Sequence, residues 1–468
     1  MKITQNNKYN FFFLLTFVAI VSSINSDINL ITNFNVNNLS IINLINFIRT
    51  LNPIILSLIL SLCIIFSKNN NEFNKNYKKV FYLIFGYLLL QFISIFFYII
   101  NFDKKINLDE IKRIYILFQS LSFFLLIYLV LLKKNSFLIK NFIYILLIIL
   151  SVYISYVLYQ IYKEDQISLT LYWNNFLQHG EILNQIVPRV SGLARTLSVI
   201  FFFLLIILLN KKLKIANSVI IFFILSMIAF IVILTQTRTV FIIDAILLLS
   251  VFCIFKVLNK NILKIFIIII LLSLSVFVTT KIYFKIKSTA NTEDFNTTKN
   301  YLRLQDEEKK KLSAIDLQNL TKEQQFFKKC HNENISINNL LTGRYCHWIY
   351  VFSKINFSIL GYGPQADRVF IKWGVSNGLI YSYICAGILG IIFYFYFIFS
   401  SLKTIKNLII KKKTAIKDNN LAIYSILIFF CMCLRSITEN SFTMFGIDQI
   451  LFFITFFYIK NINQTIYI

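Results

Sequence analysis

The sequence predicts an all-α polytopic membrane protein with about twelve transmembrane helices and one large outer loop between spans 9 and 10. Hydrophobic residues occupy 57% of the 468 positions, phenylalanine alone occurs 50 times, and the mean hydropathy is +0.69. Apolar runs repeatedly reach the roughly 17–25 residues that a helix needs to cross a bilayer. Lys and Arg also collect on alternate connecting segments, as they do in proteins that cross a membrane many times.

Each predicted span is an apolar run bounded by polar or charged residues. The twelve runs are residues 9–25, 51–67, 80–100, 114–132, 141–162, 196–210, 216–234, 239–255, 264–283, 376–400, 420–434 and 446–459. The first run follows Lys2 and Lys8 but lacks a small-x-small cleavage site. We therefore interpret it as a retained anchor and not as a signal peptide.

The net charge of +26 orients the chain in the membrane. With the N-terminus inside, the short inner segments carry 22 Lys and Arg residues against two acids, Glu72 and Asp418. The outer segments carry the other 25 basic residues together with 18 acids. This asymmetry is the positive-inside signature, and it predicts that both termini are cytoplasmic. The charge needs no nucleic-acid partner to explain it, and none is expected.

Three consecutive segments are expected along the chain. Residues 1–283 hold spans 1–9 with short loops, residues 284–375 form the large outer loop, and residues 376–468 hold spans 10–12 and a short tail. The composition, rich in Asn, Ile, Lys and Phe and poor in Gly and Pro, is typical of an AT-rich bacterial genome. The expected location is therefore the bacterial inner (cytoplasmic) membrane, with the large loop periplasmic.

The second half of this loop concentrates aromatic, basic and glycine residues. The stretch "GRYCHWIYVFSKINF" places Trp348, Val351 and Ile355 on one face of a predicted helix, with Arg344 and His347 beside that face. The stretch "GYGPQAD" then breaks the helix, because the Gly-Pro step stops it and its glycines allow positive φ. The first half of the loop is polar and is expected to form one or two solvated surface helices.

Ionisable residues at the outer ends of the spans are the strongest chemical signal, since a charge in hydrocarbon needs a partner or a cavity. They are Arg189, Arg195, Arg238, Asp244, Arg344, Arg368, Lys372, Arg435 and Glu439. Arginines that converge on one face suit a diphosphate, because the guanidinium group pairs bidentately with phosphate oxygens. A single interfacial arginine equally often only reaches the lipid headgroups. Asp244 can equally belong to a structural ion pair, and Arg435 and Glu439, at i and i+4, can simply satisfy each other.

Four motifs follow one another along the chain: "RVSGLART", "LTQTRT", "GRYCHWIYVF…GYGP" and "SNGLIYSYICAGILG". Together they resemble the O-antigen ligase/O-antigen polymerase superfamily of bacterial membrane glycosyltransferases. The resemblance covers about residues 185–400. The matching residues are Arg189, Gly192, Thr235, Thr237, Arg238, Gly343, Arg344, Trp348, Gly361, Gly363, Asn377, Gly387 and Gly390.

The resemblance implies a metal-independent polymerase of undecaprenyl-diphosphate-linked repeat units that works at the periplasmic face. The expected catalytic residues are Arg238, Arg344 and Glu439, and the expected substrate-binding residues are Arg189, Arg195, Arg368, Lys372, Asn377 and Trp348. The expected partners are a lipid-linked glycan donor and a glycan acceptor within the bilayer, with a chain-length regulator as a further candidate. No cofactor is expected.

One departure from the family pattern bears on the reaction. Ligase members carry a histidine before the conserved Asn, and this chain has Ser376 there. A serine hydroxyl does not accept a proton at neutral pH, which favours a polymerase over a ligase. His347 is the nearest substitute, but a helix-surface histidine beside Trp348 is the simpler interpretation. A transporter or flippase of lipid-linked glycans is a third class, which usually shows inverted repeats and interrupted helices. The sequence shows no such symmetry.

The repeated Cys-His pairs, Cys330-His331 and Cys346-His347, have three interpretations. They do not have the short paired ligand spacings of a zinc site, so no metal is expected. A disulfide between Cys330 and Cys346 would close a loop of about sixteen residues and contribute roughly 3 kcal/mol. Two free thiols are the alternative, because connectivity does not follow from sequence.

Overall fold

The protein is described here by a computed structural model. It describes residues 5–24, 48, 50–59, 75–101, 108–132, 136–163, 190–210, 213–235, 237–257, 267–279, 282, 326, 329–330, 344–355, 359–371, 374–411, 416 and 419–464. The regular elements within these ranges are helices. The chain divides into two compact units. Unit 1 comprises Met1–Ile149 and Val351–Ile468, and unit 2 comprises Leu150–Tyr350.

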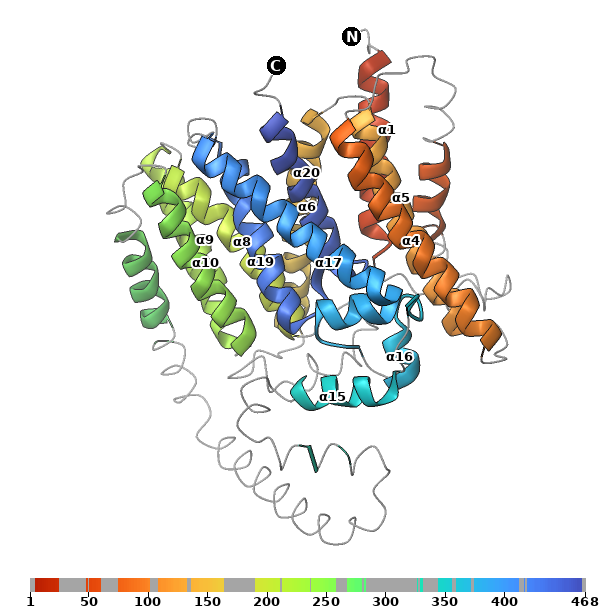
Figure 1. Cartoon of the computed structure of the whole chain (residues 1–468). Coiled ribbons are helices and arrows are strands. Elements are labelled where there is room, and N and C mark those ends of the chain that lie inside the picture. The colour runs from red at the N-terminus through yellow and green to blue at the C-terminus, as the bar shows by residue number, and fades with distance from the viewer. Residues whose placement is uncertain are drawn as a thin grey trace. The chain divides into compact units, whose positions relative to one another are not determined.

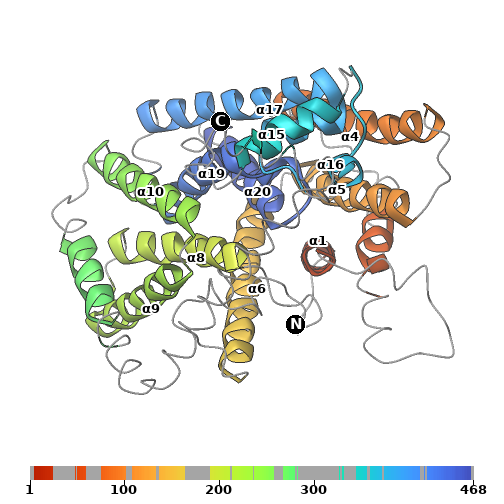
Figure 2. The ribbon, with the colours of Figure 1, turned by 90° about the horizontal axis from the view of Figure 1, so that it is seen from below.

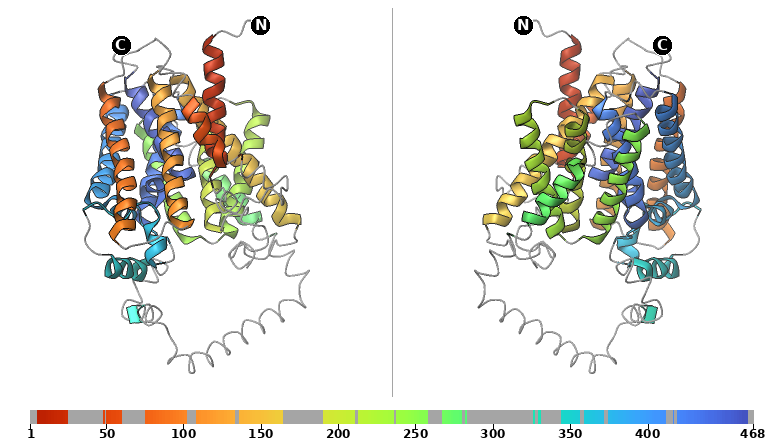
Figure 3. Two further views of the ribbon diagram at one scale, coloured as in Figure 1. Left: turned by 90° about the vertical axis from the view of Figure 1, so that its right-hand side faces the viewer. Right: turned by 90° about the vertical axis from the view of Figure 1, so that its left-hand side faces the viewer.

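Unit 1 is a bundle of apolar helices that run side by side (Figures 1 and 3). Its helices are α1 (Gln5–Ser22), α4 (Lys75–Asn101), α5 (Leu108–Leu132), α16 (Ala366–Ile371), α17 (Gly378–Lys411), α19 (Asn420–Thr438), the 3-10 turn η2 (Ser441–Thr443) and α20 (Ile447–Gln464). Helix α4 packs against α5 and α17, α1 packs against α5, and α19 and α20 pack against each other and against α17. Helix α6 (Ser136–Lys163) begins in this unit and ends in the other.

Aromatic side chains fill the space between these helices. Phe81 of α4 stacks on Phe457 of α20 with ring centroids 5.2 Å apart, and Tyr87 of α4 stacks on Phe393 of α17 at 3.8 Å. Phe453 of α20 is buried among further rings from α5 and α17. Within a bilayer, helix association depends on close packing of this kind, because lipid tails are as apolar as the side chains.

Unit 2 is built around three apolar helices. They are α8 (Val190–Asn210), α9 (Ile215–Leu234) and α10 (Arg238–Val257), and α8 packs against both of the others. A shorter apolar helix covers Ile267–Thr279. Helix α15 (Arg344–Lys354) starts in this unit and its last residues belong to unit 1. Its bounds agree with the helix that the sequence predicts there.

The helices confirm the multi-pass helical membrane class. In the described part of the chain, 8 helices are long and apolar enough to cross a membrane. They cover Tyr77–Ile100, Glu110–Leu132, Phe137–Tyr159, Gly192–Leu209, Ile215–Ile233, Thr239–Val257, Gly378–Ile410 and Asn420–Thr438. Three further apolar helices, Asn10–Ser22, Thr50–Ile59 and Ile267–Thr279, are shorter. The described helices therefore support fewer full-length spans than the twelve that the sequence predicts.

Helix α17 covers the span predicted at residues 376–400 but is longer and is interrupted. It continues to Lys411, and its backbone is non-helical at Ala386 (φ −141°, ψ 23°) and Gly387 (φ 58°, ψ −141°). Gly387 adopts this positive φ because it has no Cβ. The break frees backbone carbonyls near the start of the span.

Candidate functional site

The break in α17 receives the loop that carries the Gly-x-Gly-Pro motif. The Tyr362 N–H donates to the Ile384 carbonyl (2.7 Å), and the Gly363 N–H donates to the Cys385 carbonyl (3.0 Å). Gly361 has φ +77°, and a Cβ there would lie 2.5 Å from the Gly387 nitrogen. The loop thus pairs carbonyls that the interrupted helix leaves without helical partners, as irregular backbone within a membrane protein requires.

Arg113 of α5 holds this loop from the other side. Its side chain is buried, at 1% exposure. Its Nε donates to the Pro364 carbonyl (2.8 Å), its Nη2 donates to the Tyr362 carbonyl, and its guanidinium lies 5.2 Å from the centre of the Tyr98 ring. The loop and α16 lie against α17 and the first residues of α5 (Figure 2). Sequence reasoning missed Arg113, because a basic residue at the edge of a span looks like an ordinary loop charge.

Two hydroxyl groups complete the attachment of the loop. Ser94 Oγ of α4 donates to the Leu360 carbonyl, and the Gln365 N–H donates to the phenolic oxygen of Tyr381 on α17 (3.2 Å). Gln365 has φ 53°. Three transmembrane helices therefore fix the loop through its backbone.

Asp367 lies just after this loop, in the first turn of α16. The residue is buried at 1% exposure, and its Oδ2 accepts a hydrogen bond from the Val375 N–H (2.7 Å). Burial raises the pKa of the Asp367 carboxyl, while the hydrogen bond from Val375 and the charge of Arg368 act in the opposite direction. Arg368, a predicted substrate-binding residue, is exposed next to it. No local sequence pattern distinguishes Asp367.

Asn377, also a predicted substrate-binding residue, joins α17 to α19. Its Oδ1 accepts from the Ile380 N–H (3.0 Å), as an N-cap does, and its Nδ2 donates to the Ile437 carbonyl (2.8 Å). Both contacts are to backbone. The structure therefore brings Asn377 together with the end of α19 that carries Glu439.

Glu439, the predicted base, lies beside a buried arginine. Its Oε2 is 3.7 Å from Arg435 Nη2, whereas Asp448 Oδ2 of α20 is 2.7 Å from the same nitrogen. The i, i+4 pair expected from the sequence is thus the longer of two ion pairs. Asp448 is the closer partner, and nothing in the local pattern pointed to it because it lies on another helix.

In unit 2, helix α15 carries Arg344 and Trp348 next to a disulfide. Cys346 is bonded to Cys330, with Cα atoms 5.8 Å apart, so the structure shows the disulfide and not the pair of free thiols. The rings of Phe326 and Tyr350 also pack against each other at 5.2 Å. Burial lowers the pKa of His347 on the same helix, so its imidazole is neutral at pH 7.

The Thr-x-Thr-Arg motif forms the turn between α9 and α10. Thr235 caps α9, the Thr237 carbonyl accepts from the Val240 and Phe241 N–H groups, and Arg238 is the first residue of α10. In the same unit, Asp244 Oδ2 accepts from Ser198 Oγ of α8 (2.7 Å), and Arg195 is half-buried on α8. Arg189, Lys372 and the side chain of Arg238 lie outside the described residues, as do His331 and Gly343.

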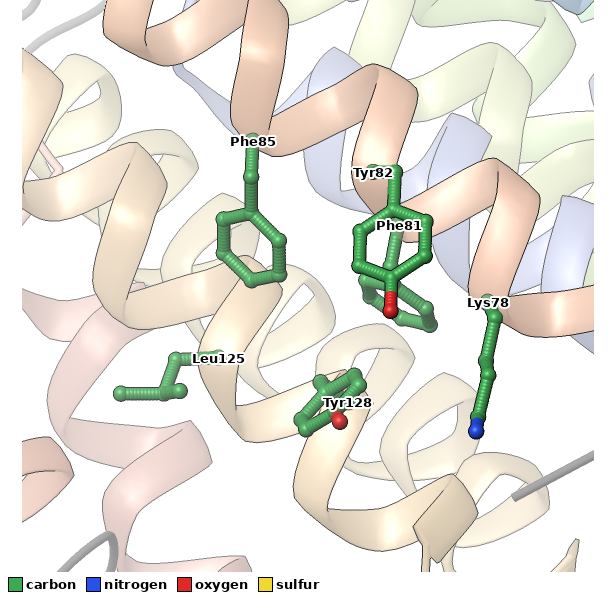
Figure 4. A pocket seen from close by; sticks show the side chains of 6 residues that line it. All are labelled: Lys78, Phe81, Tyr82, Phe85, Leu125 and Tyr128. Carbon is green, nitrogen blue, oxygen red and sulfur yellow. The ribbon is translucent and has the colours of Figure 1, made fainter.

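A separate groove between α4 and α5 is aromatic. Figure 4 shows its lining side chains, and its volume is about 290 Å³. They are Lys78, Phe81, Tyr82, Phe85, Leu125 and Tyr128. Lys78 lies near the start of α4, whereas the loop contact of Ser94 lies near its end. The groove and the loop attachment are therefore well separated along one helix. With one charged group in its lining, the groove holds no constellation for catalysis.

No family model, no curated protein and no solved structure matches the chain.

Proposed function

We propose that the protein is an integral inner-membrane glycosyltransferase that polymerises undecaprenyl-diphosphate-linked oligosaccharide repeat units, of O-antigen or a similar surface polysaccharide. One observation carries the proposal. The motif glycines that suggest this family interlock in unit 1, where Gly361 of the loop abuts Gly387 of the broken helix. A Cβ at Gly390 would likewise collide with the Ser382 carbonyl. These contacts support the proposal because they give the motif glycines a common structural role in one part of unit 1.

The proposed topology has twelve spans, cytoplasmic termini and a large periplasmic loop between spans 9 and 10. Contacts within unit 1 support it. Arg113, at the start of α5, contacts the Pro364 segment, and Asn377 contacts the end of α19. All of these segments are outer in the topology derived from the basic residues, so contacts among them are compatible with it.

The proposed reaction uses cations in place of a metal. Arg238 and Arg344, with Arg189 or Arg195 assisting, hold the donor diphosphate and stabilise it as the leaving group. Arg368 and Lys372 contact the second lipid diphosphate or the glycan, and Trp348 lies one turn from Arg344 on α15. The disulfide next to Arg344 supports this role, since it limits the freedom of the helix that presents the guanidinium.

Two other functions remain as alternatives. A ligase would transfer the same donor glycan to lipid A-core, and Ser376 disfavours it for the reason given above. A lipid-linked glycan transporter is favoured by one specific observation, the interrupted helix α17. In this structure, however, a loop fills the break and pairs with its carbonyls, so the break is not an open binding site.

A deletion strain distinguishes these functions by gel analysis of its surface polysaccharide. A polymerase defect leaves single repeat units on the core. A ligase defect leaves full-length glycan on undecaprenyl diphosphate, and a transporter defect leaves repeat units on the cytoplasmic face. Unchanged surface glycan would contradict all three.

The arginine roles are tested by complementing that strain with Arg238→Lys and Arg344→Lys. Both variants keep the charge but lose the bidentate fork, so we expect each to fail while the membrane level of the protein is unchanged. Full activity of either variant would show that the residue does not hold the diphosphate.

A further inference from the structure

The groove between α4 and α5 is preformed by aromatic side chains. Phe81 is buried, and its ring lies edge-on to the Tyr128 ring of α5, with the two centroids 5.1 Å apart. The Tyr128 ring also contacts Phe85 edge-on, at 6.2 Å, and Phe81 stacks on Phe457 of α20. Because these rings hold one another in place, a ligand that enters the groove does not have to order them.

The part of the lining that belongs to α4 runs from a charged end to an apolar end. Lys78, Tyr82 and Phe85 lie at i, i+4 and i+7, and Figure 4 shows them projecting to the same side of the helix. The rise from Lys78 to Phe85 is about 10 Å. Lys78 is the second residue of the candidate span Tyr77–Ile100. In a membrane its amine therefore lies at the level of the lipid headgroups, and Phe85 lies within the apolar layer.

The face of α4 that carries Tyr82 stays exposed and apolar beyond the groove. Tyr82 is 71% exposed, and Leu89 and Phe96, which follow at intervals of seven residues, are 60% and 41% exposed. An exposed apolar face on a membrane-spanning helix is a contact surface for lipid. The groove therefore opens toward the bilayer, and the molecule that can enter it from there is a lipid.

The charge at the headgroup end of the groove is positive. Lys78 and Lys79 are both exposed. Within the described residues the ion pairs involve Arg435, and neither lysine takes part in one. Residues 68–79 together hold four basic residues and one acid. An anionic headgroup is attracted by this charge, whereas the ammonium group of a zwitterionic headgroup is repelled.

We propose that this groove binds one phospholipid with an anionic headgroup. The headgroup phosphate accepts hydrogen bonds from the Lys78 ammonium group, and an acyl chain lies along the aromatic side chains between α4 and α5. The volume of about 290 Å³ is at the lower end of ligand cavities, roughly 300–1,000 Å³, so the groove takes one acyl chain and leaves the other in the bilayer. Such a site needs only a helical membrane protein, so its test does not involve the proposed glycosyl transfer.

Native mass spectrometry of the purified full-length chain tests the headgroup end. The chain in detergent is titrated with phosphatidylglycerol or with phosphatidylethanolamine of the same acyl chains, and we expect about fivefold tighter binding of phosphatidylglycerol. Lys78→Gln should weaken phosphatidylglycerol binding about fivefold and remove this preference. Lys79→Gln, the same change at a neighbouring residue outside the lining, is the matched control and should weaken binding less than about twofold, because solvent and salt screen its charge.

The acyl-chain end is tested separately. Tyr82→Ala changes an exposed side chain, so it should weaken the binding of both lipids while the thermal midpoint without lipid stays at the wild-type value. Phosphatidylglycerol with a photoreactive group on its acyl chain should crosslink to peptides of α4 and α5. Inorganic phosphate has no acyl chain and should not displace the lipid.

Four results overturn the site. They are equal binding of the two lipids by the wild type, equal losses in Lys78→Gln and Lys79→Gln, crosslinks only to other helices, and displacement of the lipid by inorganic phosphate. The second would show that the lysines act only through their general charge. The fourth would show that Lys78 binds a phosphate ion without a lipid chain.

Discussion

Gly361 and Arg113 illustrate how single residues build the centre of unit 1. Gly361 contributes by having no side chain, since its neighbour across the contact is the backbone of Gly387. Arg113, in contrast, contributes a long side chain, whose guanidinium group donates to two backbone carbonyls of the loop. A guanidinium buried among backbone carbonyls replaces the water that would otherwise solvate them. At this scale the site depends on steric and hydrogen-bonding detail.

The contact at Gly361 predicts a large difference between two Gly→Ala variants. Gly361→Ala places a methyl group 2.5 Å from a backbone nitrogen at a positive φ, so we expect a loss of at least about 2 kcal/mol. Gly86→Ala is the control. Gly86 lies within α4 with nothing within 4 Å of an added Cβ, so its replacement should stabilise the protein by about 0.5–1 kcal/mol. Thermal midpoints in detergent measure both. Equal midpoints would contradict the tight contact.

Arg113→Lys should destabilise the protein although it keeps the charge. An ammonium group cannot reach the Tyr362 and Pro364 carbonyls in the same fork geometry, so at least one buried acceptor loses its donor. The expected cost is about 1–3 kcal/mol, measured as a lower thermal midpoint, with Lys112→Gln on the same helix as the control. If Arg113→Lys has the same thermal midpoint as the wild type, the guanidinium does not hold the loop.

At the scale of elements, α17, α19 and α20 are held together by interactions at their ends. The break in α17 accepts the loop, Asn377 links the start of α17 to the end of α19, and Arg435 links the end of α19 to the first turn of α20. The position of Asp448 in that first turn is favourable for an anion, because the helix dipole is positive there. These polar links occur where the helices end, while aromatic packing fills the lengths between them.

The two partners of Arg435 should therefore contribute unequally to stability. Asp448→Asn removes the 2.7 Å partner of a buried arginine, and we expect a loss of about 2–5 kcal/mol. Glu439→Gln removes a partner at 3.7 Å and should cost less than about 1 kcal/mol. Unfolding in a denaturant series measures both changes. A larger loss of stability in Glu439→Gln than in Asp448→Asn would show that Glu439 is the more important partner of Arg435.

On the scale of the whole molecule, the proposed orientation in the membrane rests on charge and hydropathy. The first residues of α1 and the last residues of α20 lie on the same side of unit 1 (Figure 1). The chain from the start of α1 to the end of α20 must therefore cross the membrane an even number of times. Twelve spans meet this condition. In the proposed topology, the basic residues of the short loops place that end in the cytoplasm.

Reporter fusions test this orientation. A reporter enzyme that is active only in the periplasm should be active when inserted at residue 306 and inactive when inserted at residue 70 or fused to the C-terminus. A cytoplasmic fluorescent reporter should give the opposite pattern. Activity of the periplasmic reporter at the C-terminus would contradict the even number of spans.

The sequence by itself determined the membrane class, the helix α15 and the bend after it. These features depend on local properties, since hydropathy, helical periodicity and the conformational range of glycine act over a few residues. Contacts between distant segments were decided only by the tertiary structure. The break in α17 is accommodated because the loop fills it and pairs with its carbonyls. The roles of Arg113, Asp448 and Asp367 follow from their contacts in the structure. These contacts are with Pro364, Arg435 and Val375, respectively. The role of a charged side chain depends on the group that it contacts. Here that group lies outside the local sequence, so no local sequence pattern could predict the contact.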